Sequence, residues 1–317
     1  MCFIYSRCAF ITLLVGVAMA ILSFFGGCSH HVALPESSLP KPPNTYELTD
    51  YRSLLWEISG KGLRRPSYLF GTIHLIPKNQ FKLSDNALKA LNVADRLTLE
   101  IDMDDPTLLF SAFKSMMMSG NKTLRDFMPE EDYKLITDYF RTKGIPLDMV
   151  KRMKPILLSS MLTESGVKEE MVTYENELMN IVKKQKKKVY GLETAAYQMR
   201  VLDSIPYDKQ AKMLVDAIRK TNDPTQKDEV DEYAQMLKLY ADQDIGGMYT
   251  FVSTSSGDMQ QYERSLLSTR NHNWIPVMAK MMPRNATFFA VGAGHLGGQN
   301  GLISLLRKEG YEVKPLR

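Results

Sequence analysis

The chain has 317 residues, 44% of them hydrophobic, and its 40 Lys and Arg residues nearly balance 36 Asp and Glu residues, which leaves a net charge of +4. A chain of this length can bury a large core without disulfide staples, and the near balance of charge gives no indication of a nucleic-acid partner. The three cysteines, Cys2, Cys8 and Cys28, all lie near the N-terminus. The rest of the chain therefore has no internal disulfide.

The N-terminal segment has the pattern of a secretory signal. Arg7 precedes an uncharged, mostly apolar run from Ala9 to Phe25, and Gly26-Gly27-Cys28 follows, as small residues do before a signal cleavage site. This ending resembles a bacterial lipobox, in which Cys28 becomes the lipidated first residue of the mature protein. The alternative is an uncleaved helix of about 17 apolar residues, near the lower limit for a membrane span. Both interpretations predict a protein body outside the cytoplasm, tethered to a membrane.

Three regions are predicted along the chain: a lipoprotein signal peptide at residues 1–27, a flexible stalk at 28–45 and one folded domain at 46–317. The stalk is rich in Pro and Ser and has no apolar period, as is typical of a linker. By resemblance to lipoprotein sorting rules, Ser29 after the cysteine favours an anchor in the outer membrane or at the periplasmic face of a bacterial cell envelope.

The folded part is predicted to begin and end with strands. A hairpin is expected from residues 54–59 and 64–74 across Gly60-Lys61-Gly62, and a short helix from Ser84-Asp85. Apolar spacing predicts helices over most of 106–186, with breaks near 118–121 and 143–146, and again over 194–282. Further strands are expected at 94–102, 187–193, 286–292 and 310–316.

This order of elements predicts the fold class. We expect an α/β (α+β) domain whose central mixed sheet is built from both ends of the chain. Helices flank the sheet, and a large helical insertion occupies the middle of the sequence.

The same short motif occurs near both ends of the domain. Gly71-Thr72-Ile73-His74-Leu75 and Gly292-Ala293-Gly294-His295-Leu296 both read G-x-x-H-L after an apolar, aromatic-rich run. Each histidine is predicted just past the carboxyl end of a buried strand, where open α/β sheets place their sites. We attribute each glycine to a backbone turn that leaves no room for a Cβ.

Glu100 is expected at the same edge of the sheet, because it follows the apolar run Leu97-Thr98-Leu99 at the end of another strand. Two imidazoles and a carboxylate are a common ligand set for a divalent metal, with positions left for water and substrate. His74, Glu100 and His295 are therefore the candidate metal ligands. The alternative is that both histidines are hydrogen-bonded core residues.

Five stretches together carry a family resemblance: YLFGTIHLIP, RLTLEID, VYGLET, LLSTRNHNW and FFAVGAGHLGGQNGLISLLRKEGYEVKPL. They resemble the TraB/GumN family, which is related to the Tiki proteases and to the broader class that includes erythromycin esterases and haem-binding ChaN. The resemblance extends from about Ser53 to the C-terminus. It implies a metal-dependent, peptidase-like site in which His74, Glu100 and His295 match the family's paired G-x-x-H histidines and glutamate.

Two further positions match the family. Glu193 in GLET would be a general base or an added ligand, or else an acid favoured by the dipole at a helix N-terminus. Arg270 would pair with Glu100 or a substrate carboxylate, or else form an ordinary buried ion pair. His272, two residues further on, does not share a helix face with Arg270 and is expected at the surface or in a supporting position.

The main functional hypothesis is a membrane-tethered, extracytoplasmic metallopeptidase that acts on a peptide or protein and uses a divalent ion such as Mn, Co, Zn or Fe. The catalytic residues would be Glu100, Glu193 and Arg270. One alternative is a haem or ligand carrier of the ChaN-like class, which would use a histidine as axial ligand. The other is a non-catalytic factor that sequesters a peptide.

Overall fold

The computed structural model describes residues 52–166, 170–222, 232–254 and 262–317. The predicted signal peptide, Cys28 and the stalk lie outside the described residues. Within the described residues, no helix is long and apolar enough to cross a membrane.

Most strands form one mixed sheet of six strands, in the order β6-β4-β7-β2-β1-β8. A separate two-stranded sheet pairs β3 with β5. The bounds of the strands are β1 Leu55–Ser59, β2 Ser67–Thr72, β3 Ile76–Pro77, β4 Arg96–Ile101, β5 Met171–Val172, β6 Lys188–Glu193, β7 Thr287–Gly292 and β8 Glu312–Pro315.

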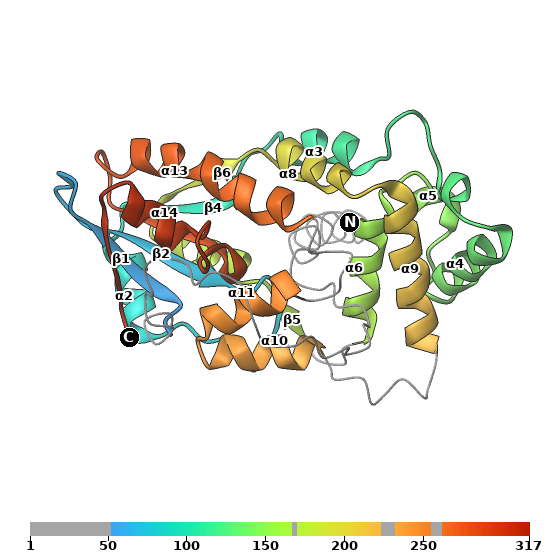
Figure 1. The fold of residues 1–317 in the computed structure, drawn as a ribbon, viewed down its shortest axis with the longest axis horizontal. Coiled ribbons are helices and arrows are strands. Elements are labelled where there is room, and N and C mark those ends of the chain that lie inside the picture. Colours follow the sequence, from blue (N-terminus) through green and yellow to red (C-terminus); the bar gives the residue numbers. More distant parts are fainter. Residues whose placement is uncertain (1–51, 167–169, 223–231, 255–261) are drawn as a thin grey trace, which may run out of the picture. The chain divides into compact units, whose positions relative to one another are not determined.

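Helices fill most of the remaining described chain (Figure 1). The α-helices are α2 Asp85–Val93, α3 Leu108–Met116, α4 Glu130–Thr142, α5 Leu147–Val150, α6 Pro155–Gly166, α7 Tyr174–Lys184, α8 Ala195–Val201, α9 Tyr207–Asn222, α10 Glu232–Ala241, α11 Ile245–Thr254, α13 Thr269–Met281 and α14 Leu302–Lys308. Short 3₁₀ segments are η3 Leu124–Phe127, η4 Leu202–Ser204 and η7 Ala293–His295, and η6 Arg264–Ser268 is a π-helical turn.

The described residues divide into two compact units. The described parts of 73–82 and 97–231 form the first unit, in which α6 packs on α9 and α3 packs on α8. The described parts of 25–72, 83–96 and 232–317 form the second unit, which contains β1, β2, β7 and β8.

The prediction that both ends of the chain build the sheet is confirmed. β1 pairs antiparallel with β2 and with the C-terminal strand β8, and β2 runs parallel to β7. Figure 1 draws the blue N-terminal strands beside the red C-terminal elements. Every residue of β2 and β7 is buried, which explains why both read as nearly continuous apolar runs.

Local signals correctly located the hairpin turn, the start of α2 and a break between helices. The predicted hairpin turns at Gly60, Lys61 and Gly62, all of which have positive φ, the conformation that glycine adopts without strain. The Ser84 side chain accepts a hydrogen bond from the backbone N–H of Ala87 and caps α2. The predicted break at residues 143–146 contains Gly144 at φ +71°.

The structure differs from the sequence prediction in two places. The two-residue strands β3 and β5 were not predicted, because strands this short leave no measurable alternation. The prediction that Gly71 is needed for a backbone turn was wrong, because Gly71 lies inside β2. A Cβ on Gly71 would lie 3.0 Å from Cβ of Ala293, so this glycine permits close approach of the chain after β7.

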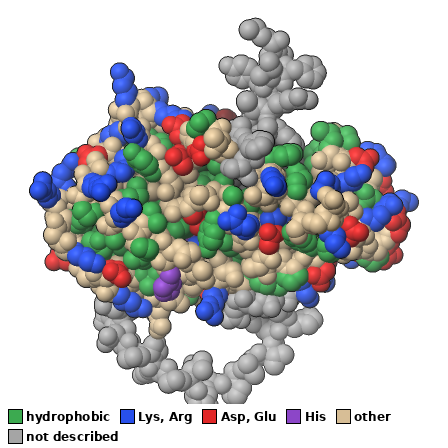
Figure 2. All heavy atoms as spheres, turned by 90° about the horizontal axis from the view of Figure 1, so that it is seen from above, with side chains coloured by type: hydrophobic (Ala, Val, Ile, Leu, Met, Phe, Trp, Pro, Cys, Tyr) green, Lys and Arg blue, Asp and Glu red, His purple; other side chains and the backbone are tan. Residues whose placement is uncertain are grey.

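Charged side chains of both signs are interspersed on the face of the molecule seen in Figure 2. This distribution agrees with the near balance of acidic and basic residues in the sequence.

Candidate functional site

His74 is a buried histidine two residues past the end of β2. It is 3% exposed, and its Nδ1 lies 2.9 Å from Oε1 of Glu175, which is equally buried. Because an ionised carboxylate only accepts hydrogen bonds, the Nδ1–H group of His74 donates to Glu175. A neutral ring with its proton on Nδ1 carries its lone pair on Nε2.

Glu100 faces that second nitrogen. Its Oε1 lies 4.0 Å from Nε2 of His74, and its Oε2 accepts a hydrogen bond of 2.9 Å from Nε2 of Gln198. Alternation along β4 puts Glu100 and Thr98 on the face opposite to Leu97 and Leu99. The carboxylate is 2% exposed, so the fold holds it away from bulk water.

Gln198 was missed by the sequence analysis. It lies on α8 in a buried stripe with Ala195, Met199 and Leu202, which is the helical spacing of a core face. Its Nε2 donates to Glu100, and its Oε1 has no hydrogen-bond partner among the residues that the structure describes. A lone polar residue on an apolar stripe is the signal that would have identified it.

Glu175 was also missed, and it carries the same signal. It occupies a buried stripe of α7 together with Leu178, Met179 and Val182. The predicted helical region around it did not single out a site residue. A carboxylate buried this deeply requires a partner, and His74 provides one.

His295 has different neighbours. It ends the 3₁₀ segment η7, and its Nδ1 donates a hydrogen bond of 2.6 Å to Oδ1 of Asn271. Its Nε2 accepts one of 3.1 Å from Nη1 of Arg270, and its ring lies 4.5 Å from that of Trp274, centroid to centroid. Both ring nitrogens are therefore engaged, and a metal at Nε2 requires that Nη1 of Arg270 move away first.

Arg270 lies on α13 and is fully buried. Besides His295, its Nη1 donates to the backbone oxygen of Leu266 at 3.1 Å, and its guanidinium lies 4.7 Å from the ring centroid of Trp274. These contacts place Arg270 against the second histidine, a partner that the sequence analysis did not propose.

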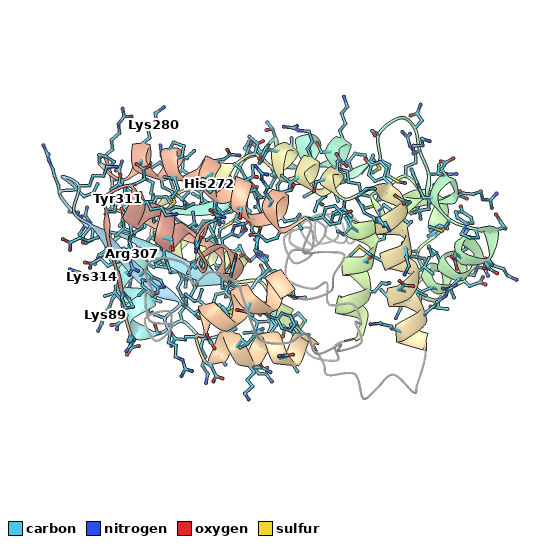
Figure 3. All side chains as sticks on the ribbon, viewed as in Figure 1. Lys89, His272, Lys280, Arg307, Tyr311 and Lys314 are labelled. Atoms are coloured by element: carbon cyan, nitrogen blue, oxygen red, sulfur yellow. The ribbon has the colours of Figure 1, made fainter. Side chains whose placement is uncertain are left out.

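His272 follows Arg270 on α13 but is exposed. Its side chain is labelled on α13 in Figure 3, and its Nδ1 lies 2.8 Å from the backbone oxygen of Ser268. The expectation that His272 and Arg270 occupy different faces of the helix is confirmed.

Glu193 is the last residue of β6 and is only partly buried. It directly precedes Thr194, whose side chain accepts a hydrogen bond from Tyr197 N–H and caps α8. This position agrees with an acid beside a helix N-terminus. Its catalytic role stays a prediction.

A further carboxyl, that of Asp102, lies two residues after Glu100 in the sequence. Burial raises the pKa of Asp102 above its ordinary value. The hydrogen bond that Asp102 accepts from Asp104 N–H lowers the pKa, but by less than burial raises it. The nearby charges of Asp104 and Asp105 raise the pKa of Asp102 further.

The candidate metal ligands fall into two groups. His74 and Glu100 belong to the first compact unit, and His295 to the second. No set of three or more His, Cys, Asp or Glu side chains is arranged to hold a metal ion within the described ranges. The distance between His74 and Glu100 is compatible with two ligands of one metal ion. The ring of His295 is not available as a metal ligand in its present hydrogen bonds. A metal ion shared by all three residues therefore stays a prediction.

Comparisons with known proteins agree with the family resemblance. The family model described as "TraB/PrgY/gumN family" matches residues 54–315. The chain is 22% identical to "Metalloprotease TIKI1" of Danio rerio over 84% of its length and 63% of the relative's. For "Metalloprotease TIKI1" of Homo sapiens the identity is 23% over 84% of this chain and 62% of the relative. For the "Metalloprotease TIKI homolog" of Amphimedon queenslandica the identity is 22% over 88% of this chain and 65% of the relative.

The chain therefore spans less than two thirds of the length of these metalloproteases. No solved structure matches it.

Proposed function

The chain belongs to the TraB/PrgY/gumN family, and on that basis we propose that it is a metal-dependent peptidase that cleaves a peptide or protein. In this proposal His74, Glu100 and His295 bind one divalent ion, with Mn, Co, Zn and Fe as candidates. The observation that carries it is the buried pair of His74 and Glu100, whose facing atoms are 4.0 Å apart. The metalloprotease names of the relatives support it.

The distance of 4.0 Å between Nε2 and Oε1 argues for a ligand pair. It exceeds the 3.2 Å or so of an N–H···O hydrogen bond. Two atoms bound to one ion at about 2.0–2.2 Å can lie up to about 4.4 Å apart. A bound divalent ion would lower the pKa of a water and polarise a peptide carbonyl.

The register of the sheet supports including His295. β2 and β7 are parallel neighbours in which Thr72 lies opposite Gly292. His74 follows Thr72 by two residues, and His295 follows Gly292 by three. Both histidines therefore follow the carboxyl ends of adjacent strands, where α/β sheets place their sites.

The residues around these histidines have distinct tasks in the proposal. Gln198 holds Oε2 of Glu100, so Oε1 is the oxygen that faces His74. Glu193 is the candidate general base that takes a proton from the attacking water. Arg270 leaves Nε2 of His295 and binds the carboxylate of a substrate or of Glu100.

We further propose that the protein is attached to a bacterial membrane through a lipid on Cys28 and acts in the cell envelope. The support is the uncharged run that ends in Gly26-Gly27-Cys28. The body of the enzyme would then meet peptides outside the cytoplasm.

The test uses the full-length chain, purified in detergent, with metal analysis and a peptide-library digest with and without chelator. We expect cleavage that chelator abolishes and that added Mn²⁺, Co²⁺ or Zn²⁺ restores. His74→Ala and Glu100→Gln should each lose most of the bound metal and of the cleavage, and the double variant should be little worse than either, since the ligands act as one unit.

His272→Ala is the matched control, because His272 is the exposed histidine on α13 and should retain wild-type metal content. Cleavage that persists in chelator would contradict the proposal. Tight peptide binding without any cut product, in wild type and Glu100→Gln alike, would favour peptide sequestration instead.

A further inference from the structure

The contact between Glu175 and His74 joins two buried groups that are 101 residues apart in the sequence. Their atoms Oε1 and Nδ1 are separated by 2.9 Å, and each residue is 3% exposed. At this distance and burial the hydrogen bond is charge-assisted and is not weakened by water. The ring of His74 is thereby held at one nitrogen.

The small sheet of β3 and β5 brings the two residues together. Ile76 lies opposite Val172 in antiparallel register. Two residues before Ile76 is His74, and three residues after Val172 is Glu175, so the same ladder positions both. Each additional backbone hydrogen bond, such as Lys78 N–H to Glu170 O at 2.8 Å, limits how far either segment can shift.

The first turn of α7 then fixes the direction of the carboxylate. Thr173 caps the helix through a hydrogen bond from Asn176 N–H. The neighbouring Tyr174 donates its hydroxyl to Lys82 O at 2.9 Å and packs on Phe81 with ring centroids 4.7 Å apart. Glu175 therefore projects from an anchored turn, and its side chain lies on the buried face.

We propose that Glu175 is a positioning residue that fixes the tautomer of His74, so that Nε2 presents its lone pair on the side of Glu100. This inference rests on the proposed metal-dependent function. In a neutral ring whose Nδ1 proton is donated to Glu175, the lone pair of Nε2 lies on the side of Oε1 of Glu100.

The matched variants are Glu175→Gln and Glu177→Gln. Glutamine at 175 keeps the size and one acceptor but loses the charge, and its amide N–H₂ also allows the opposite ring tautomer. Glu177 lies two residues further along α7, on a different and partly exposed face. Both variants are made in the full-length chain, and urea unfolding checks that each is folded.

The first readout is the affinity for Co²⁺ alone, measured by competition with a chelating indicator. Loss of a hydrogen-bond partner behind a metal-bound histidine weakens metal binding by about 10- to 100-fold. We expect a loss in this range for Glu175→Gln and a change within about twofold for Glu177→Gln. A folded Glu175→Gln protein with wild-type affinity would overturn the inference.

The second readout is the ¹⁵N chemical shift of the His74 ring in metal-free wild-type protein, assigned by comparison with His74→Ala. We expect protonated Nδ1 and unprotonated Nε2, and a ring protonated at Nε2 would overturn the inference. This readout also covers a Glu175→Gln variant that fails to fold. If the wild type binds no Co²⁺, the proposed function fails, and the ring tautomer still decides the role of Glu175.

Discussion

Glu175 and Gln198 are single polar residues on otherwise apolar helix faces, and each contacts one candidate ligand. Glu175 accepts from His74, and Gln198 donates to Glu100. Burial of such groups is unfavourable unless they are hydrogen-bonded. A polar residue at a core position of an amphipathic helix therefore indicates a partner on another element.

Arg270 offers a test at the level of one side chain. We predict that Arg270→Lys lowers the free energy of unfolding by about 1–3 kcal/mol. Lysine keeps the charge but loses the planar group that bonds to His295 and Leu266 O and stacks on Trp274. Urea unfolding measures the change, and Arg264→Lys, at an exposed position on η6, serves as control. Equal stability of both variants would be inconsistent with this account.

Close contact between elements gives the second prediction. Gly71→Ala should lower the free energy of unfolding by about 1–3 kcal/mol, because the new Cβ would lie 3.0 Å from Cβ and 3.2 Å from Cα of Ala293. Gly246→Ala is the control, since its Cβ would meet only Oδ1 of Asp244, at 3.6 Å, and it lies in α11. The control should change stability by less than about 1 kcal/mol or increase it. Thermal unfolding of the two variants makes the comparison.

Lys154 directly precedes α6 and contacts the end of α8 and η4. It is 1% exposed, and its Nζ donates to the backbone oxygen of Met199 at 2.6 Å and to Oδ1 of Asp203 at 2.8 Å. Burial lowers the pKa of Lys154 from its ordinary value of 10.5, although Asp203 opposes the shift. Between the lowered pKa and 10.5 the unfolded chain binds more protons than the folded one, so stability rises with pH.

The third prediction follows from this increase of stability with pH. Lys154→Met should destabilise the protein by about 1–3 kcal/mol at neutral pH, because Met199 O loses its donor. The difference from wild type should grow as the pH rises toward 10.5. Urea unfolding at pH 7 and pH 9.5 measures it, with Lys151→Met, which removes the exposed ion pair to Asp148, as control. A difference that shrinks at high pH would mean that burial does not lower this pKa.

For the whole molecule, the N-terminal tether is the feature to test. We predict that Cys28→Ser moves the protein from the membrane fraction to a soluble or unprocessed form, because the lipid attachment point is lost. Cell fractionation followed by mass analysis of the N-terminus is the measurement. A processed Cys28→Ser protein that still fractionates with membranes would refute the lipid anchor.

Local patterns in the sequence were enough to predict the hairpin, the strands that carry G-x-x-H, the start of α2 and the main breaks in the helical region. Apolar runs, glycine turns and Ser84 act through neighbours a few residues away, so they can be recognised without the fold. The same patterns singled out His74, Glu100 and His295 as polar residues at the ends of strands, and the family resemblance added Glu193 and Arg270.

The partners of those residues depended on tertiary structure. Glu175 reaches His74 through the β3–β5 pairing, Gln198 reaches Glu100 across 98 residues, and Arg270 occupies Nε2 of His295. Two-residue strands have no periodicity, and a polar residue on an apolar helix stripe indicates burial but does not reveal which distant residue it contacts. Which charge faces which nitrogen is determined only when distant segments pack together, because hydrogen bonds act over about 3 Å in space and have no fixed distance along the chain.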